Sequence, residues 1–208
     1  IRRYSGIPKK GLVPDDTART LIHGYDASVS YVDAQVGKVL AELDRLGLRD
    51  KTVVIIWGDH GYQLGEHATW NKRTDWEIAT RVPLMISIPG QSTRGRSTDA
   101  LVEFVDVYPT LAELCGLTPP AKLAGKSFAP LIKTPDAKWK SAAFSVYKKQ
   151  VKELGGTAYG RAMVTDRYRF IEWSGPHSDK RVYELYDHES DPQENTNVAN
   201  RPENKALV

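Results

Sequence analysis

The fold of this chain is decided by one short apolar run and the polar loop that follows it, Thr52-Val53-Val54-Ile55-Ile56-Trp57 and Gly58-Asp59-His60-Gly61-Tyr62-Gln63-Leu64-Gly65-Glu66-His67. The β-branched run predicts a strand that is buried on both faces. Polar groups at the carboxyl end of such a strand lie where open α/β sheets bind ligands. Asp59 and His60 are therefore candidate ligands for a divalent cation, and the flanking glycines allow a close approach of the backbone. The alternative is that Asp59 caps a turn and His60 bonds to its own loop.

The residues that follow favour the metal-site interpretation. The loop continues as Gly65-Glu66-His67-Ala68-Thr69-Trp70-Asn71-Lys72, and a second apolar run follows as Ala79-Thr80-Arg81-Val82-Pro83-Leu84-Met85-Ile86-Ser87-Ile88-Pro89-Gly90. This pattern resembles the second signature region of the sulfatases in the alkaline-phosphatase superfamily. It is most similar to the iduronate-sulfatase branch, which carries Asp-His-Gly, Leu-Gly-Glu-His and Trp-x-Lys at this spacing. Further likeness lies at residues 25–33, 184–187 and 191–192, so the resemblance covers most of the chain.

The resemblance implies an enzyme that hydrolyses a sulfuric ester, and it implies roles for particular residues. The family binds one calcium ion at its active site, and Asp59 and His60 match two of the ligands. Calcium prefers hard oxygen ligands, which suits Asp59, whereas imidazole suits softer metals. Lys72 matches the lysine that contacts the sulfate and stabilises the charge of the transition state. His67 and Tyr62 are weaker candidates for substrate binding, because His67 can instead brace the loop and Tyr62 can pack in the core.

The nucleophile of that family has no counterpart in the sequence. It is a formylglycine made from cysteine in a Cys-x-Pro-x-Arg motif, but Cys115 is followed by Gly116-Leu117-Thr118-Pro119. The serine-containing stretch Ser174-Gly175-Pro176-His177-Ser178 lacks the arginine. The family's early aspartate pair is also missing, and two protein ligands do not satisfy a calcium ion that takes roughly six to eight oxygens.

We therefore expect the C-terminal portion of a sulfatase, incomplete and inactive alone. The chain opens on Ile1 without an initiator methionine, which fits a start inside a longer protein. The expected partner is the N-terminal portion of the same enzyme, in cis or as a separate chain, carrying the formylglycine. The expected substrate is a sulfated carbohydrate, such as a uronate of a glycosaminoglycan, and the resemblance implies a periplasmic, secreted or lysosomal location.

Two other functions stay open at this point. The first is a phosphatase or phosphonate hydrolase of the same superfamily, because the scaffold and the metal loop serve both kinds of ester. The second is a degenerate domain that binds without catalysis. The identity of the nucleophile separates the two enzymes, and metal binding by the complete protein separates either enzyme from the degenerate domain.

The composition is that of an ordinary globular protein. The chain has 208 residues, of which 40% are hydrophobic and 26% are charged, with a formal net charge of +3. No apolar run approaches the ~18 residues that a membrane span needs. The densest basic groups, Lys148-Lys149 and Arg167 to Arg169, are predicted to be solvated faces rather than a nucleic-acid site.

The first element is predicted to be a long helix. Asp15-Asp16-Thr17 offers N-caps, and Gly47 ends the helix after Leu46. Its apolar residues form one stripe at steps of three and four, namely Ile22, Tyr25, Val29, Val32, Val36, Val39, Leu43 and Leu46. Because a buried strand comes next, this stripe is predicted to pack on a sheet rather than in a coiled coil. The helix and the strands at 52–57 and 83–89 together predict a parallel α/β sheet.

A short helix is predicted after the second strand. Asp106 caps it, it runs from Val107 to Cys115, and Gly116 ends it. Cys115 shares a helical spacing with Leu111, which predicts a buried, inert thiol.

Beyond residue 120 the pattern changes to short strands. They are predicted at 142–147, 162–165, 168–173 and 182–186, with a tight turn at Asp166-Arg167 between the middle two. The predicted fold class is therefore α/β, in two parts. Residues 1–120 form the C-terminal part of a parallel-sheet, alkaline-phosphatase-like catalytic core with metal loop 58–72, and residues 121–208 form a small α+β subdomain with an antiparallel sheet. His23, His177 and His188 have no partner pattern and no predicted role.

Overall fold

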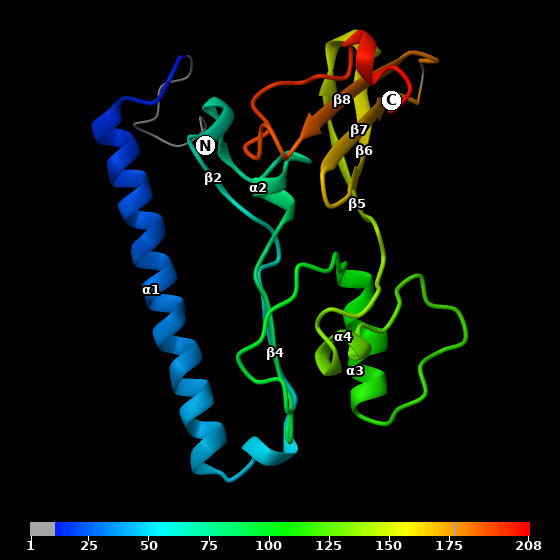
Figure 1. Cartoon of the computed structure of the whole chain (residues 1–208). Coiled ribbons are helices and arrows are strands. Elements are labelled where there is room, and N and C mark those ends of the chain that lie inside the picture. Colours follow the sequence, from blue (N-terminus) through cyan, green and yellow to red (C-terminus); the bar gives the residue numbers. More distant parts are fainter. Residues whose placement is uncertain (1–10, 177) are drawn as a thin grey trace. The chain divides into compact units, whose positions relative to one another are not determined.

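The computed structural model describes residues 11–176 and 178–208, and Figure 1 labels its elements. Contacts within the chain divide it into two compact units. The first contains the described residues up to Thr74 together with Ile78–Gly90, and the second contains Asp75–Glu77 together with Gln91–Val208. The predicted division at residue 120 stays a prediction, because these units reflect only the contacts made inside this chain. His177 lies outside the described residues.

The first unit begins with the long helix α1, Asp15–Arg45. Pro14 is its N-cap residue, so the predicted capping by Asp15, Asp16 or Thr17 is wrong. Asp15 and Asp16 lie inside the first turn instead, where their charges face the positive end of the helix dipole. At the other end Gly47 has a positive φ of 66° just beyond the helix, which confirms the predicted stop.

The apolar stripe of α1 is largely exposed in the described chain. No residue of this fully described helix is buried, and Val29, Val32 and Val39 are 53%, 58% and 69% exposed. The predicted packing of the stripe on a sheet is therefore not made by the described residues. One ring of the stripe, Tyr25, stacks on Tyr62 with the ring centroids 5.3 Å apart. Even with this stripe, neither α1 nor another helix of the described chain is long and apolar enough to span a membrane.

The decisive apolar run forms β1, Val54–Trp57, and the second run forms β4, Leu84–Ser87. The two strands pair antiparallel, so the predicted parallel arrangement is wrong for this pair. Their connection carries the one-turn helix α2, Glu77–Thr80, which is too short to act as the crossover helix of parallel strands. The predicted burial on both faces is also wrong here, because β1 is half-buried and its last residue, Trp57, is exposed.

Between β1 and α2 the chain forms a small hairpin. Its strands are β2, Gln63–Leu64, and β3, Trp70–Asn71, which pair antiparallel. A 3-10 turn, Glu66–Ala68, joins them. Of the predicted site residues only His67 lies within this hairpin; Asp59, His60 and Tyr62 precede it, and Lys72 follows it directly.

The second unit contains two short helices around one buried carboxylate. They are α3, Val107–Leu114, and α4, Ala129–Lys133. Asp106 is the N-cap residue of α3 as predicted, but its side chain makes no capping hydrogen bond to the helix. The Asp106 side chain is fully buried, and its Oδ1 accepts hydrogen bonds from Lys126 N at 2.7 Å and Lys140 Nζ at 2.8 Å. This carboxylate therefore joins α3 to the segments on either side of α4.

Cys115 is exposed, so the prediction of a buried thiol is wrong. It is the C-cap residue of α3, and the buried face of this helix carries Val107 and Thr110. Leu111 lies four residues after Val107, on the same face, and is half-buried, whereas Cys115 comes after the last helical residue, Leu114. Gly116 follows with a φ of 67°, which confirms the predicted end of the helix.

The predicted short strands form one antiparallel sheet in the order β5-β6-β7-β8. They are longer than predicted: β5 is Ala143–Val151, β6 is Gly156–Val164, β7 is Tyr168–Ser174 and β8 is Arg181–Asp187. The predicted tight turn joins β6 to β7, where Thr165 N donates to Tyr168 O at 2.8 Å. The prediction of short antiparallel strands with a central hairpin is confirmed.

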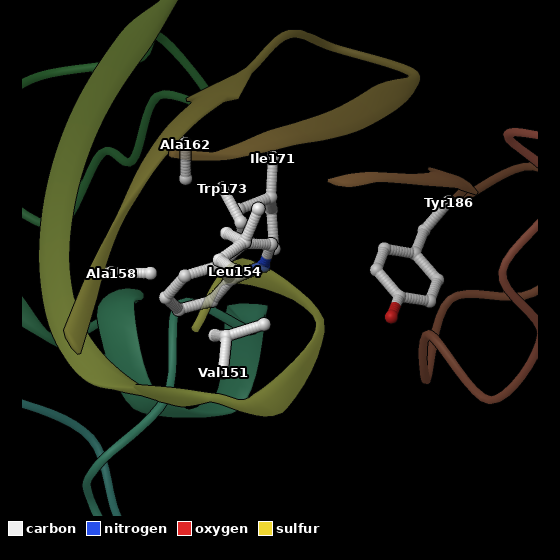
Figure 2. Packing of buried hydrophobic residues seen from close by; sticks show 7 residues of the cluster. All are labelled: Val151, Leu154, Ala158, Ala162, Ile171, Trp173 and Tyr186. Atoms are coloured by element: carbon white, nitrogen blue, oxygen red, sulfur yellow. The ribbon is translucent and has the colours of Figure 1, made fainter. Parts of the chain in front are cut away.

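One face of this sheet holds an apolar core, shown in Figure 2. Its buried members are Val151, Leu154, Ala158, Ala162, Ile171, Trp173 and Tyr186. Ile171 and Trp173 are two residues apart on β7, and alternate residues of a strand point to the same face. Leu154 comes from the 3-10 turn Lys152–Leu154 after β5 and covers the same cluster. The alternation along β7 therefore determines which side chains form the core.

We expect Ile171→Ala to lower the free energy of unfolding by about 2–5 kcal/mol, because it removes buried methylene groups and leaves a cavity. The matched control is Val146→Ala on β5, where the side chain is 67% exposed. That control should cost less than about 1 kcal/mol. Urea unfolding followed by circular dichroism measures both variants. Equal losses would contradict the assignment of the core to this face.

Candidate functional site

The candidate loop starts where β1 ends, and its two glycines hold it in place. Gly58 N donates to Pro83 O at 3.1 Å, and Gly61 N donates to Ala79 O at 2.9 Å. A Cβ at Gly61 would lie 1.9 Å from Ile78 O, so a side chain does not fit at this position. The two predicted metal ligands lie between these glycines and are therefore fixed at both ends.

Three of the five predicted site residues meet at this loop. His60 Nε2 lies 3.2 Å from Asp59 Oδ2, and Lys72 Nζ contacts the same ring nitrogen. Lys72 reaches this point from the residue directly after β3. The Asp59 side chain is 82% exposed and the His60 ring is half-buried. A carboxylate, an imidazole and an ammonium group therefore converge at one solvent-accessible place in the first unit.

The backbone of the loop determines which nitrogen of His60 faces this place. Nδ1 lies 2.9 Å from the Gly61 carbonyl oxygen, which can only accept a hydrogen bond. In the neutral ring Nδ1 therefore carries the proton and donates it, and Nε2 keeps its lone pair. A hydrogen bond of this kind orients histidine ligands in metal sites.

The arrangement fits one side of a divalent-cation site. Oxygen ligands lie roughly 2.3–2.6 Å from a calcium ion, so two neighbouring ligand atoms are roughly 3–4 Å apart. The ligand atoms of Asp59 and His60, at 3.2 Å, meet that spacing. Two ligands are too few for calcium, so a site of this type needs further oxygens from elsewhere. The role of the pair as metal ligands stays a prediction.

The tip of the hairpin is braced by Glu66. Leu64 N donates to Glu66 Oε2 at 2.6 Å, and Thr69 N donates to Glu66 O at 2.9 Å. The two residues after Glu66, His67 and Ala68, have positive φ values of 52° and 53°, which residues with side chains seldom adopt. The structure places His67 at this tip, and its role in substrate binding stays a prediction.

Tyr62 lies between the ligand pair and the hairpin and is half-buried. Its ring stacks on Tyr25 of α1 with an interplanar angle of 29°, so one face of the ring is used for packing. Trp70 of β3 is buried, which supports a packing role for that ring too. The predicted contact of Tyr62 with substrate stays a prediction.

A buried ionic cluster in the second unit was missed by reasoning from the sequence. Arg169 is 2% exposed; its Nε donates to Glu194 Oε1 at 2.6 Å, and its Nη2 contacts Glu77 Oε2. His188 Nε2 lies 2.7 Å from the same Glu194 oxygen. The prediction that Arg167 to Arg169 form a solvated face is therefore wrong for Arg169. Strand alternation is the signal that could have found it, because it puts Arg169 on the core face of β7.

This cluster does not require a metal ion. The ligand atoms of Glu77, His188 and Glu194 lie within 4.8 Å of one another, a spacing that an ion could bridge. Arg169 already contacts both carboxylates, so its guanidinium supplies the positive charge that an ion would bring. We therefore interpret the cluster as a buried ion-pair network.

Asp75 is a second buried acid of this unit, in a less favourable environment. Its Oδ1 accepts a hydrogen bond from Ser145 Oγ at 3.3 Å, and its Oδ2 has no hydrogen-bond partner among the described residues. A Cβ at Gly160 would lie 2.6 Å from Oδ2, so β6 passes very close to the carboxylate. Burial raises the pKa of Asp75 to about 6, although Ser145 and the charges of Arg169 and Lys149 oppose the shift.

Two protein families match this chain. The family described as Sulfatase matches residues 5–117, and the family described as N-sulphoglucosamine sulphohydrolase, C-terminal, matches residues 65–208. A protein of Formosa agariphila named Sulfatase is 34% identical over 190 residues, which are 91% of this chain and 34% of that protein. Iduronate 2-sulfatase of Mus musculus is 39% identical over 142 residues, which are 57% of this chain and 26% of that protein. The chain thus spans about a third or less of the length of these relatives.

Solved structures share the fold. The phosphonate monoester hydrolase SpPMH from Silicibacter pomeroyi matches with a TM-score of 0.84 and 26% identity, covering 98% of this chain and 41% of that one. BT4656 in complex with its substrate D-glucosamine-2-N,6-O-disulfate matches with a TM-score of 0.76 and 28% identity, covering 87% of this chain and 36% of that one. These likenesses confirm the predicted fold class, an alkaline-phosphatase-like α/β core portion followed by a small lobe with an antiparallel sheet.

The raised pKa of Asp75 predicts a pH-dependent stability. Between about pH 4 and pH 6 the folded chain keeps a proton on Asp75 that the unfolded chain releases, so this residue lowers the free energy of unfolding as the pH rises through that window. We expect Asp75→Asn, which removes the charge, to raise the free energy of unfolding by about 1–3 kcal/mol at pH 7.5 and to change it little at pH 4. Urea unfolding at a series of pH values measures this difference.

Asp187→Asn on β8 provides a control of opposite sign. The Arg167 guanidinium lowers the pKa of Asp187, so this carboxylate stabilises the folded chain above its unfolded pKa and loses that effect as the pH falls through the lowered pKa. Asp187→Asn should therefore lower the free energy of unfolding at pH 7.5. The same sign in both variants would contradict burial as the cause of the Asp75 shift.

Proposed function

Since this chain belongs to the sulfatase family, we propose that it forms part of an enzyme that hydrolyses a sulfuric ester of a sugar. The observation that carries the proposal is the convergence of Asp59, His60 and Lys72 in the loop after β1. Cleavage of a sulfate ester needs positive groups aimed at the sulfate oxygens and at the leaving alcohol. Lys72 is one such positive group, and Asp59 and His60 each offer a ligand atom that can hold a second one, a bound cation.

Lys72 is the residue that we assign to the sulfate. Its ammonium is a compact charge with three donors, which suits a sulfate oxygen or the bridging oxygen. In this structure its Nζ lies at His60 Nε2, next to the ligand pair. Negative charge on the leaving oxygen grows as the bond to sulfur breaks, so a donor fixed at this place favours the transition state over the bound substrate.

Asp59 and His60 are the residues that would hold a calcium ion, through a carboxylate oxygen and the Nε2 lone pair. Because Lys72 Nζ contacts the same nitrogen in this structure, the ammonium would have to move aside to admit the ion. When bound, such an ion supplies Lewis-acid polarisation of the sulfate oxygens. The Nδ1 hydrogen bond to Gly61 O leaves Nε2 of His60 on the side of Asp59 and Lys72. The 82% exposure of the Asp59 side chain leaves its oxygens accessible to a ligand from solvent.

The nucleophile and the remaining metal ligands are proposed to come from the N-terminal portion of the same enzyme, in cis or as a separate chain. The motif that would yield formylglycine does not occur in this sequence. Two ligands also leave a calcium ion unsatisfied. We therefore propose that this chain on its own does not hydrolyse sulfate esters. A periplasmic, secreted or lysosomal location is part of the same proposal.

The proposed substrate class is a sulfated carbohydrate. One relative is the iduronate 2-sulfatase of Mus musculus, and another is the N-acetylglucosamine-6-O-sulfatase of Bacteroides thetaiotaomicron, 32% identical over 86% of this chain. A phosphonate monoester is the second candidate, because the Silicibacter pomeroyi hydrolase matches 98% of this chain with a TM-score of 0.84. A cation beside a lysine can hold either tetrahedral anion.

In the complete enzyme we expect Lys72→Ala to lower kcat/KM for 4-nitrophenyl sulfate by about 10²–10³-fold, since one preorganised donor to the developing charge is lost. Lys51→Ala, at an exposed lysine after α1, is the matched control and should leave kcat/KM unchanged. Steady-state kinetics measures both. Comparable losses in the two variants would contradict a specific role of Lys72. A larger kcat/KM for a phenyl phosphonate than for the sulfate would favour the second candidate.

Calcium binding tests the ligand pair separately. We expect Asp59→Asn and His60→Ala each to weaken calcium binding by the complete enzyme by at least about tenfold. Asp50→Asn, an exposed acid in the same unit, should have no effect. Isothermal titration calorimetry measures the affinity. If the complete protein does not bind calcium or another divalent cation, the degenerate binding domain replaces the enzyme as the better explanation.

A further inference from the structure

Three residues, Asp75–Glu77, belong to the second unit by their contacts, although the chain on both sides of them belongs to the first. We call them the tie segment. Lys72 lies three residues before this segment. Ala79, which accepts a hydrogen bond from Gly61 N at 2.9 Å, lies two residues after it. In the sequence the tie segment therefore lies between Lys72 and Ala79, the residue that holds the loop at Gly61.

The main chain of the tie segment is held by two side chains of the second unit. Arg169 Nη1 donates to Asp75 O at 3.0 Å. Glu77 N donates to Glu194 Oε2 at 2.7 Å. The backbone is thus fixed at the first and the last residue of the segment.

The side chains of the tie segment add further contacts. The Glu77 carboxylate contacts Arg169 Nη2. Trp76 Nε1 donates to Tyr186 OH at 3.1 Å, and that hydroxyl donates to Glu184 Oε2 at 2.7 Å. All three residues of the segment are therefore bonded to the second unit.

The burial of Arg169 and Glu194 makes the attachment of the tie segment specific. The side chains of Arg169 and Glu194 are 2% and 1% exposed. Water has no access to replace a lost partner, so breaking either contact leaves an unpaired charge in the interior. His188 Nε2, 2.7 Å from Glu194 Oε1, further fixes the orientation of that carboxylate. Few other arrangements satisfy all these groups at once, which favours one conformation of the tie segment.

We propose that Arg169, Glu194 and Glu77 are positioning residues for Lys72: by holding the tie segment, they fix the chain three residues beyond the lysine. The proposal rests on the sulfate-binding role proposed above for Lys72. Three residues span at most about 11 Å, so a fixed Asp75 restricts the places that Lys72 can reach. Even a shift of about 1 Å in a donor of this kind can lower the rate strongly.

Glu77→Gln in the complete enzyme tests the attachment, because it removes the charge that contacts Arg169 and keeps the shape of the side chain. Backbone hydrogen exchange over residues 70–77 should rise, while the protection of β6 and β7 stays unchanged. We expect kcat/KM for 4-nitrophenyl sulfate to fall by about tenfold or more. Glu172→Gln is the matched control, since Glu172 lies on β7 but pairs with Arg161 and Arg181. It should change neither measurement.

A double-mutant cycle with Lys72→Ala tests whether the effect passes through the lysine. The proposal predicts that Glu77→Gln lowers kcat/KM in the native background and leaves it unchanged in the Lys72→Ala background. Equal losses in both backgrounds overturn the proposal, and so does increased exchange over residues 70–77 without a loss of kcat/KM. Unchanged exchange in a folded Glu77→Gln enzyme overturns it as well.

Failure of the proposed function gives a different result. In that case Lys72→Ala alone leaves kcat/KM unchanged, whatever Glu77→Gln does to hydrogen exchange. If Glu77→Gln does not fold, Trp76→Phe takes its place in both experiments. This second variant removes the hydrogen bond from Trp76 Nε1 to Tyr186 OH and keeps an aromatic ring in the same position. The same outcomes then support or overturn the proposal.

Discussion

The buried guanidinium of Arg169 is the interaction on which the second unit depends most. An arginine has five N–H donors and keeps its charge at any physiological pH, so in the interior it has to be surrounded by acceptors. The carboxylates of Glu194 and Glu77 and the carbonyl of Asp75 provide them. These acceptors come from the tie segment and from the residues after β8. The hydrogen bonds of this one guanidinium therefore bring together three separate parts of the sequence, namely the tie segment, β7 and the residues after β8.

The proximity of the candidate residues could be predicted from the sequence, whereas their roles came from the resemblance to the sulfatases and stay predictions. Asp59 and His60 are adjacent in the chain, and a short hairpin returns Lys72 to the same loop, so their proximity follows from local geometry. The close approach at Gly61 is also a local constraint, because it joins the loop to the turn that precedes β4. The long amphipathic helix and the alternating strands were predictable for a similar reason, since each carries several repeats of one period.

Features that depend on distant residues were not predictable from the same patterns. Arg169 stands in a run of basic residues that is typical of a surface, and its burial depends on acceptors that are 25, 92 and 94 residues away in the sequence. The antiparallel pairing of β1 with β4 depends on how the intervening segment folds. In each case the residues that determine the structure are too far away in the sequence to be part of a local pattern.

The separation of these partners along the chain has a consequence for the order of folding. Asp75 and Arg169 are 94 residues apart, and Glu77 and Glu194 are 117 residues apart. Contacts of such long range form late, because the entropy of closing a large loop has to be overcome first. During synthesis the loop with Lys72 leaves the ribosome long before Glu194 does. The loop can form its own hydrogen bonds early, but it acquires its anchor only after residue 194 has been made. A chain that stops before residue 194 would therefore keep the sequence motif of the site and lose the means of completing its attachment.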